Sequence, residues 1–247
     1  MLVRRSRIFA PSIEGAYAFV LNNNAAIVID ALVHFDAYTS DMHDFDDSLP
    51  QYQASAHYLH PLGEKLIVGG YAGYGFAPFD DSDEEYQVGF IGGTVVYKAS
   101  DVISIFGQAG YGTSFDAVVM SSAGFFNGYT VRAGVIYTGL ANASIRAEAE
   151  YASTERYEGP DEPGEMWTVA VLGESQLAVM ENMAVTYGVR YGSFDALTDS
   201  DLANETTVSV GFKYMFGGAT TDRFTEIGYV GSPYLPLRGS FWTPTMD

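Results

Sequence analysis

Carboxylates are the side chains of this 247-residue sequence with the clearest capacity to bind a ligand. The densest group of them is Asp80, Asp81, Asp83, Glu84 and Glu85. Carboxylate oxygens are hard ligands that suit Ca²⁺ or Mg²⁺, but this run lacks the glycine and the spacing of an EF-hand loop. We therefore expect weak divalent-cation binding there or a plain charged surface, and neither a firm metal site nor any other cofactor.

The histidines are the next candidates for chemistry. They are His34, His43, His57 and His60. Asp41 and His43 form an Asp-x-His pair within an acidic stretch, and an omptin-like protease would need such a pair together with further aspartate pairs. The neighbouring segments supply no supporting catalytic pattern, and the absence of cysteine excludes thiol nucleophiles, thiolate zinc sites and disulfides. We therefore expect no catalytic residues and a protein that is not an enzyme.

Composition narrows the class of protein further. Lys and Arg number 12 against 31 Asp and Glu, so the formal net charge is −19. Nucleic-acid binding is not expected, because phosphate contacts need clustered basic side chains. The 27 glycines, 18 tyrosines and 16 phenylalanines suit an all-β chain. The sequence contains no run of 18 or more apolar residues, so it predicts no membrane-spanning helix.

Apolar residues alternate with polar or small ones along most of the chain, which is the period of a β-strand. Residues 205–216 are the clearest case, since Val208, Val210 and Phe212 share one face while Ser209 and Gly211 share the other. The pattern predicts eleven strands, most of them long, at 12–21, 25–39, 51–61, 65–79, 85–98, 101–115, 126–138, 143–157, 165–179, 183–195 and 204–216.

The connections between these strands alternate between short and long, as expected for an up-and-down antiparallel meander. The long ones are 40–50, 80–84, 116–125, 158–164 and 196–203. In and around them lie 18 of the 31 acidic residues, so the negative charge is concentrated at one end of the predicted barrel. This polarisation differs from the evenly spread acidity of a halophilic soluble protein.

The polar face of the strands carries small residues and charges of both signs, with few lysines. A membrane barrel has a polar interior and an apolar outer band, whereas a soluble barrel reverses this arrangement. We expect the lumen to be lined by Asp30, His34, Asp36, Arg132, Arg146, Glu148, Glu150, Glu174, Arg190 and Lys213. These charges would form either a salt-bridged plug or the lining of a polar channel.

The segment 208–216 resembles the closing strand of bacterial outer-membrane β-barrels. Gly211, Tyr214 and Phe216 carry the resemblance, although 31 residues follow Phe216, whereas the family usually ends at that residue. The resemblance implies a transmembrane barrel in the outer membrane of a Gram-negative bacterium, surrounded by lipid and lipopolysaccharide and inserted by the barrel-insertion machinery. Because that family has an even number of strands, it also implies twelve, with 8–14 as the range.

Three regions are predicted from these boundaries: an N-terminal segment 1–11, a barrel 12–216 and a C-terminal tail 217–247. A twelfth strand would lie within 2–10, upstream of Met1 or at 222–231, and otherwise the tail would be a plug or a docking segment for a protein partner. Residues 1–11 do not read as a signal peptide, so either the chain is cytoplasmic or the sequence lacks its true N-terminus, and the strand pattern of the remaining chain favours the second.

The function expected from this sequence is a non-enzymatic barrel: a narrow porin-like channel, or a structural surface protein with acidic extracellular loops. Two alternatives remain. One is an autotransporter-like translocator barrel, which needs an upstream passenger that the sequence does not display. The other is a soluble secreted β-barrel with an apolar core.

Overall fold

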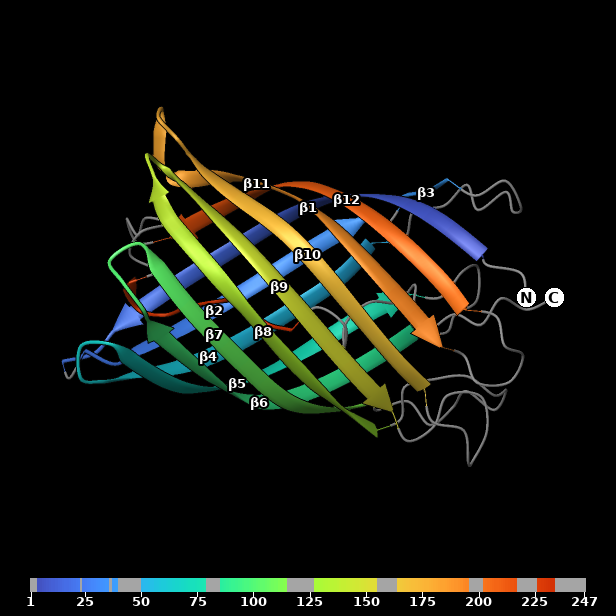
Figure 1. Ribbon diagram of the computed structural model, residues 1–247, viewed down its shortest axis with the longest axis horizontal. Helices are drawn as coiled ribbons and strands as arrows, with labels where there is room; N and C mark the ends of the chain where they lie inside the picture. Colours follow the sequence, from blue (N-terminus) through green and yellow to red (C-terminus); the bar gives the residue numbers. More distant parts are fainter. Residues whose placement is uncertain are drawn as a thin grey trace.

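The computed structural model describes residues 4–22, 24–35, 37–39, 50–78, 85–114, 127–154, 164–195, 202–216 and 226–233. These residues form an all-β closed barrel (Figure 1). Its strands are β1 (Arg4–Val20), β2 (Ala26–Phe35), β3 (Ala37–Thr39), β4 (Pro50–Leu62), β5 (Leu66–Pro78), β6 (Glu85–Lys98), β7 (Ile103–Ser114), β8 (Asn127–Leu140), β9 (Ala143–Thr154), β10 (Gly164–Leu177), β11 (Met180–Asp195) and β12 (Leu202–Phe216). The predicted all-β, up-and-down barrel is confirmed.

Eleven of these strands make up the described wall. From β4 to β12 each strand pairs antiparallel with the next, and β2 joins β4 to β1. The short β3 continues the line of β2 and pairs with the same strand, β1, so it adds no position around the barrel.

The barrel closes between its first and last strands, which run parallel. In this seam Ile13 lies opposite Phe212 and Glu14 opposite Lys213. An up-and-down meander with an odd number of strands brings its two ends together in the same direction, so eleven strands close here, one fewer than the twelve expected. Residues 4–10 extend β1 instead of forming a strand of their own, and the described part of 222–231 lies outside the sheet.

The tight connections gather at one end of the barrel, at the left in Figure 1. Three of them place a residue in the left-handed region: Asn24 (φ 61°), Gly63 (φ 77°) and Asn142 (φ 58°). Glycine and asparagine tolerate that conformation best, which explains why the chain reverses at these points. We call this the tight-turn end and the opposite one the long-loop end.

The two faces of the wall differ sharply in chemistry. In β10, Trp167, Val169 and Val171 point outward and are 44–58% exposed, while Thr168 and Ala170 point inward and are buried. The same alternation surrounds the barrel, with aliphatic residues in a central outer belt that includes Ile29, Ile91, Ile105, Val131, Val189 and Val210. Exposed aromatic residues flank this belt: Tyr52, Tyr74, Tyr111, Tyr129, Trp167 and Tyr191 toward the long-loop end, and Tyr17, Phe19, Tyr58, Tyr97, Tyr137, Tyr214 and Phe216 toward the tight-turn end. No helix in the described part of the chain is long and apolar enough to cross a membrane.

Candidate functional site

The barrel interior holds a cluster in which one carboxylate serves three guanidinium groups. Glu148 on β9 accepts from Arg132 Nε at 3.1 Å and from Arg190 Nη2 at 2.7 Å, and Arg146 Nε lies 2.9 Å from the same carboxylate. Glu148 is 5% exposed, so its charge is compensated by these partners and not by bulk water. We call Arg132, Arg146, Glu148 and Arg190 the lumen charge cluster.

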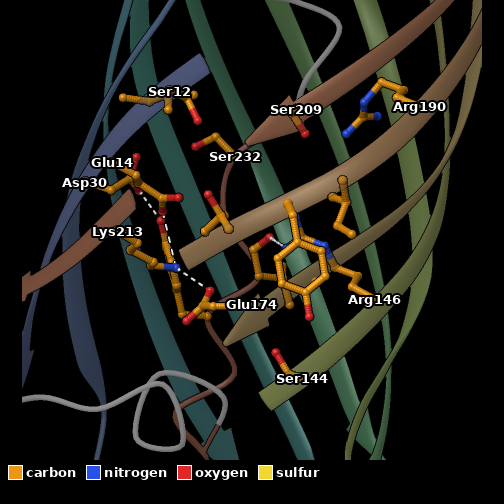
Figure 2. Close-up of a pocket in the computed structure, with 18 of the residues that line it drawn as sticks. Ser12, Glu14, Asp30, Ser144, Arg146, Glu174, Arg190, Ser209, Lys213 and Ser232 are labelled. Atoms are coloured by element: carbon orange, nitrogen blue, oxygen red, sulfur yellow. Dashed lines mark hydrogen bonds and ion pairs between the residues drawn. The ribbon is translucent and has the colours of Figure 1, made fainter. Parts of the chain in front are cut away.

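A second charged group spans the seam where the barrel closes. Lys213 Nζ of β12 lies 3.3 Å from Glu14 Oε1 of β1 and 3.3 Å from Glu174 Oε2 of β10 (Figure 2). A close approach of the backbones supports this contact, because a Cβ on Gly211 would lie 2.2 Å from Ser12 Oγ and 2.6 Å from Ser12 O. Gly211 is therefore required by the seam, and Tyr214 and Phe216 of the same strand point outward, 40% and 51% exposed.

Residues 226–233, which follow the last strand, lie inside the barrel; we call them the lumenal segment. The Tyr229 hydroxyl donates to Asp30 Oδ2 of β2 at 2.8 Å, and Ser232 Oγ donates to Ser55 Oγ of β4 at 2.7 Å. Val230 is 3% exposed and packs in the same apolar cluster as wall residues such as Phe106. The two side-chain bonds thus anchor the segment to the neighbouring strands β2 and β4, where Asp30 and Ser55 are register partners.

The lumen charge cluster holds the lumenal segment by its main chain. Arg146 Nη1 donates to Val230 O, and Arg132 Nη1 donates to Ser232 O, both at 2.9 Å. Gln108 Nε2 donates to Gly231 O, also at 2.9 Å. Three consecutive carbonyl groups therefore accept from three wall side chains. Two of these donors are charged, and a hydrogen bond from a charged donor is stronger than one between neutral groups.

A cavity of about 250 Å³ remains beside this segment, lined by wall residues from β1, β2, β4 and β8–β12 and by residues 229–233 (Figure 2). Glu14, Glu174 and Arg146 face it with side chains that are 24%, 18% and 28% exposed. Hydroxyl groups of Ser12 and Ser209 also line it. The interior is therefore polar and roomy enough for water, but the lumenal segment fills the space next to it.

His57 lies between an acid and two serines, a combination that invites comparison with a hydrolase triad. Its Nε2 is 3.0 Å from Asp30 Oδ2, 3.1 Å from Ser55 Oγ and 3.1 Å from Ser232 Oγ. In a serine hydrolase the two imidazole nitrogens divide these tasks, one facing the acid and the other the nucleophile. Here one nitrogen faces all three groups, so the geometry is that of a buried polar network that positions Ser232.

The structure places most of the predicted lumen residues together. Asp30, Arg132, Arg146, Glu148, Glu150, Glu174, Arg190 and Lys213 all point inward, in the two charged groups or beside them. The side chain of His34 and the residue Asp36 lie outside what the structure describes, as do Asp41, His43 and the acidic residues Asp80, Asp81, Asp83 and Glu84. Glu85 begins β6, but its side chain is likewise outside the described part. Among the residues described, no group of three or more acidic, histidine or cysteine side chains could hold a metal ion.

Several interior residues were not predicted, although the alternation of β4 contains their signal. Gln51, Ser55 and His57 point inward, while Tyr52 and Tyr58 point outward. Glu14 and Gln108 follow the same rule on β1 and β7. The lumenal segment has no comparable periodicity, and its contacts are made largely by main-chain atoms that every residue possesses.

No protein-family model matches this chain, and no curated protein is significantly similar to it in sequence.

Proposed function

We propose that this protein is an integral outer-membrane β-barrel of the narrow porin-like kind, closed at rest and without enzymatic activity. One observation carries the proposal: the wall is apolar outside and charged inside. Residues such as Val171 and Ile91 are 58% and 64% exposed, whereas Arg132 and Glu148 are 2% and 5% exposed. This is the arrangement expected when lipid, and not water, surrounds the barrel.

The soluble alternative fits this arrangement poorly. A soluble barrel would hide its aliphatic residues and present its charges to water, yet here the outer belt continues around the wall. A contiguous apolar surface of that extent is a liability in water and marks contact with a membrane or another protein. Wall strands of 10–17 residues are also long enough to supply the roughly 9–11 tilted residues that cross a bilayer.

The two rows of exposed aromatic residues support the same conclusion. Amphipathic rings prefer the interface between hydrocarbon and headgroups, and membrane barrels carry them at both edges of the apolar band. With the tight turns in the periplasm, the acidic connections would be extracellular, where divalent cations could bridge them to lipopolysaccharide phosphates. The closing strand would be the part that the insertion machinery recognises.

The lumen favours the porin-like proposal over a translocator barrel. A translocator passes a segment that precedes its barrel through the pore. Here the described occupant of the lumen, residues 226–233, follows the last strand. The same nitrogen of His57 faces both Asp30 and Ser232, whereas a hydrolase triad uses one imidazole nitrogen for the acid and the other for the nucleophile. This difference supports a non-enzymatic role.

Membrane fractionation combined with a heat-modifiability gel tests this proposal. The full chain should partition with outer membranes, require detergent for extraction and change its mobility when boiled. A protein that remains in solution without detergent and shows no mobility change would refute membrane integration and favour the soluble alternative.

A further inference from the structure

We propose that the lumenal segment is a displaceable plug: a peptide ligand, carried by the chain itself, that keeps the barrel closed until it leaves the lumen. This inference rests on the proposed membrane function, because a conducting state has meaning only across a bilayer. Residues 226–233 are the gate, and the inner wall is their binding site.

The site recognises mainly a peptide backbone. The carbonyl groups of Val230, Gly231 and Ser232 accept from Arg146, Gln108 and Arg132. Water or a passing solute can replace a carbonyl acceptor at such donors, so these bonds are exchangeable.

The described wall keeps its charge pairs when the segment leaves. Glu148 is paired with three guanidinium groups from β8, β9 and β11, and none of these ion pairs involves residues 226–233. The barrel closes through β1 and β12, which are also independent of the segment. Departure therefore breaks no ion pair of the lumen charge cluster, and the buried Asp30 loses the Tyr229 hydroxyl but keeps Ser55 and His57 as partners.

The segment is placed for movement. It belongs to no strand of the sheet, and Gly228 and Gly231 adopt φ values of 77° and 72° that glycine tolerates best. Residues 229–233 line the cavity of about 250 Å³, so there is open space beside them. Lys98 Nζ holds the Glu226 carbonyl at 2.8 Å near the tight-turn end, where Lys98 ends β6.

Other contacts keep the closed state dominant. Tyr229 and Val230 are 7% and 3% exposed within the apolar cluster that includes Val96 and Phe106. The Tyr229 hydroxyl adds a bond to the Asp30 carboxylate. The open state is therefore a minority state, and weakening these anchors raises its population.

A reversible cross-link tests the plug in the full-length protein. Ser55 Oγ and Ser232 Oγ are 2.7 Å apart, and the chain contains no cysteine of its own. A Ser55→Cys/Ser232→Cys protein should form a disulfide when oxidised and give no openings in a planar bilayer. After reduction it should show the rare openings of the unmodified chain. The single variants and the unmodified chain serve as controls that should not respond to reductant.

A second variant weakens the plug without a cross-link. Tyr229→Phe keeps the ring but removes the bond to Asp30, and should raise the frequency of openings about tenfold or more. Tyr97→Phe, on the outer face, should leave openings unchanged.

The outcomes separate this inference from the proposed function. Suppose that the protein inserts into membranes and changes its gel mobility on heating. Equal conductance of the oxidised and reduced double variant would then refute the plug, and so would the absence of openings in Tyr229→Phe. Failure of the disulfide to form refutes the lumenal placement of Ser232. Failure of the unmodified chain to enter membranes refutes membrane integration instead.

Discussion

Glu14 and Lys213 face each other across the barrel seam, one on the first strand and one on the last, with Oε1 and Nζ 3.3 Å apart. The two strands run in the same direction, so this pair marks a parallel closure in an otherwise antiparallel wall. Glu174 holds the same ammonium group from the next strand but one. The closure thus combines a main-chain ladder with a charged contact inside the barrel.

The parallel seam predicts a specific cross-link. Ile13 and Phe212 are register partners on the outer face, 63% and 47% exposed. The double variant Ile13→Cys/Phe212→Cys should form a disulfide in high yield, because in-register neighbours lie within reach of the bond. Non-reducing electrophoresis after mild oxidation measures it. Ile13→Cys paired with Val208→Cys, four positions away in register, is the control; preferential cross-linking of that control would contradict the seam.

Glu148 should be the most costly carboxylate to neutralise. Glu148→Gln leaves two buried guanidinium groups, Arg132 and Arg190, and the partly exposed Arg146 without their shared counter-charge, so the free energy of unfolding should fall by about 3–5 kcal/mol. Urea titration in detergent, followed by the heat-modifiability gel, measures the change. Glu64→Gln in an exposed tight turn should change it by about 0.5 kcal/mol or less. Equal midpoints for the two variants would show that the lumen charge cluster does not stabilise the barrel.

Two adjacent glycines of β6 should respond in opposite ways to alanine. A Cβ on Gly92 would lie 2.3 Å from the Tyr71 hydroxyl and 2.4 Å from the Ala109 carbonyl oxygen, whereas on Gly93 its nearest neighbour is 3.7 Å away. Gly92→Ala should therefore cost about 1–3 kcal/mol. Gly93→Ala should be neutral or slightly stabilising, because it restricts the unfolded chain. The same urea titration compares them, and a larger loss in Gly93→Ala would contradict the inward placement of Tyr71.

The depth of an outer position should determine what a charge costs there. Val189 lies on the outer face of the middle of β11, and Val189→Arg should lower stability in lipid vesicles by about 2–4 kcal/mol. Val179, 93% exposed in a tight turn, gives the matched substitution Val179→Arg, with an expected cost of about 0–1 kcal/mol. Folding yield and urea midpoints in vesicles measure both. Equal tolerance of the two arginines would argue that no bilayer surrounds β11.

Much of the wall could be predicted from the sequence because strand alternation is a local signal. Val208, Ser209 and Val210 alternate in chemistry, and the structure turns them alternately outward and inward. The tight turns were predictable for the same reason, since Asn24 and Gly63 are turn-forming residues at strand junctions.

The closure could not be predicted in this way. It pairs Arg4 with Ala203 and Tyr17 with Phe216, residues about 200 positions apart, and no local pattern distinguishes a parallel partner from an antiparallel one. The even-number rule of the resembling family therefore led to twelve strands. The contacts of Val230 and Gly231 were equally hidden, because their carbonyl groups, and not their side chains, meet the arginines.

Site-specific quenching distinguishes a wall whose apolar face meets lipid from one whose polar face does. Single cysteines replace Val208, Ser209 and Val210 in turn, each is labelled with an environment-sensitive fluorophore, and spin-labelled lipids are added to vesicles that hold the full-length protein. Val208 and Val210 are 44% and 41% exposed on the outer face, whereas Ser209 lines the inner cavity. Lipid quenching at 208 and 210 with little at 209 is the result predicted. Quenching at 209 alone, or at none of the three positions, would contradict a barrel that faces lipid with its apolar side.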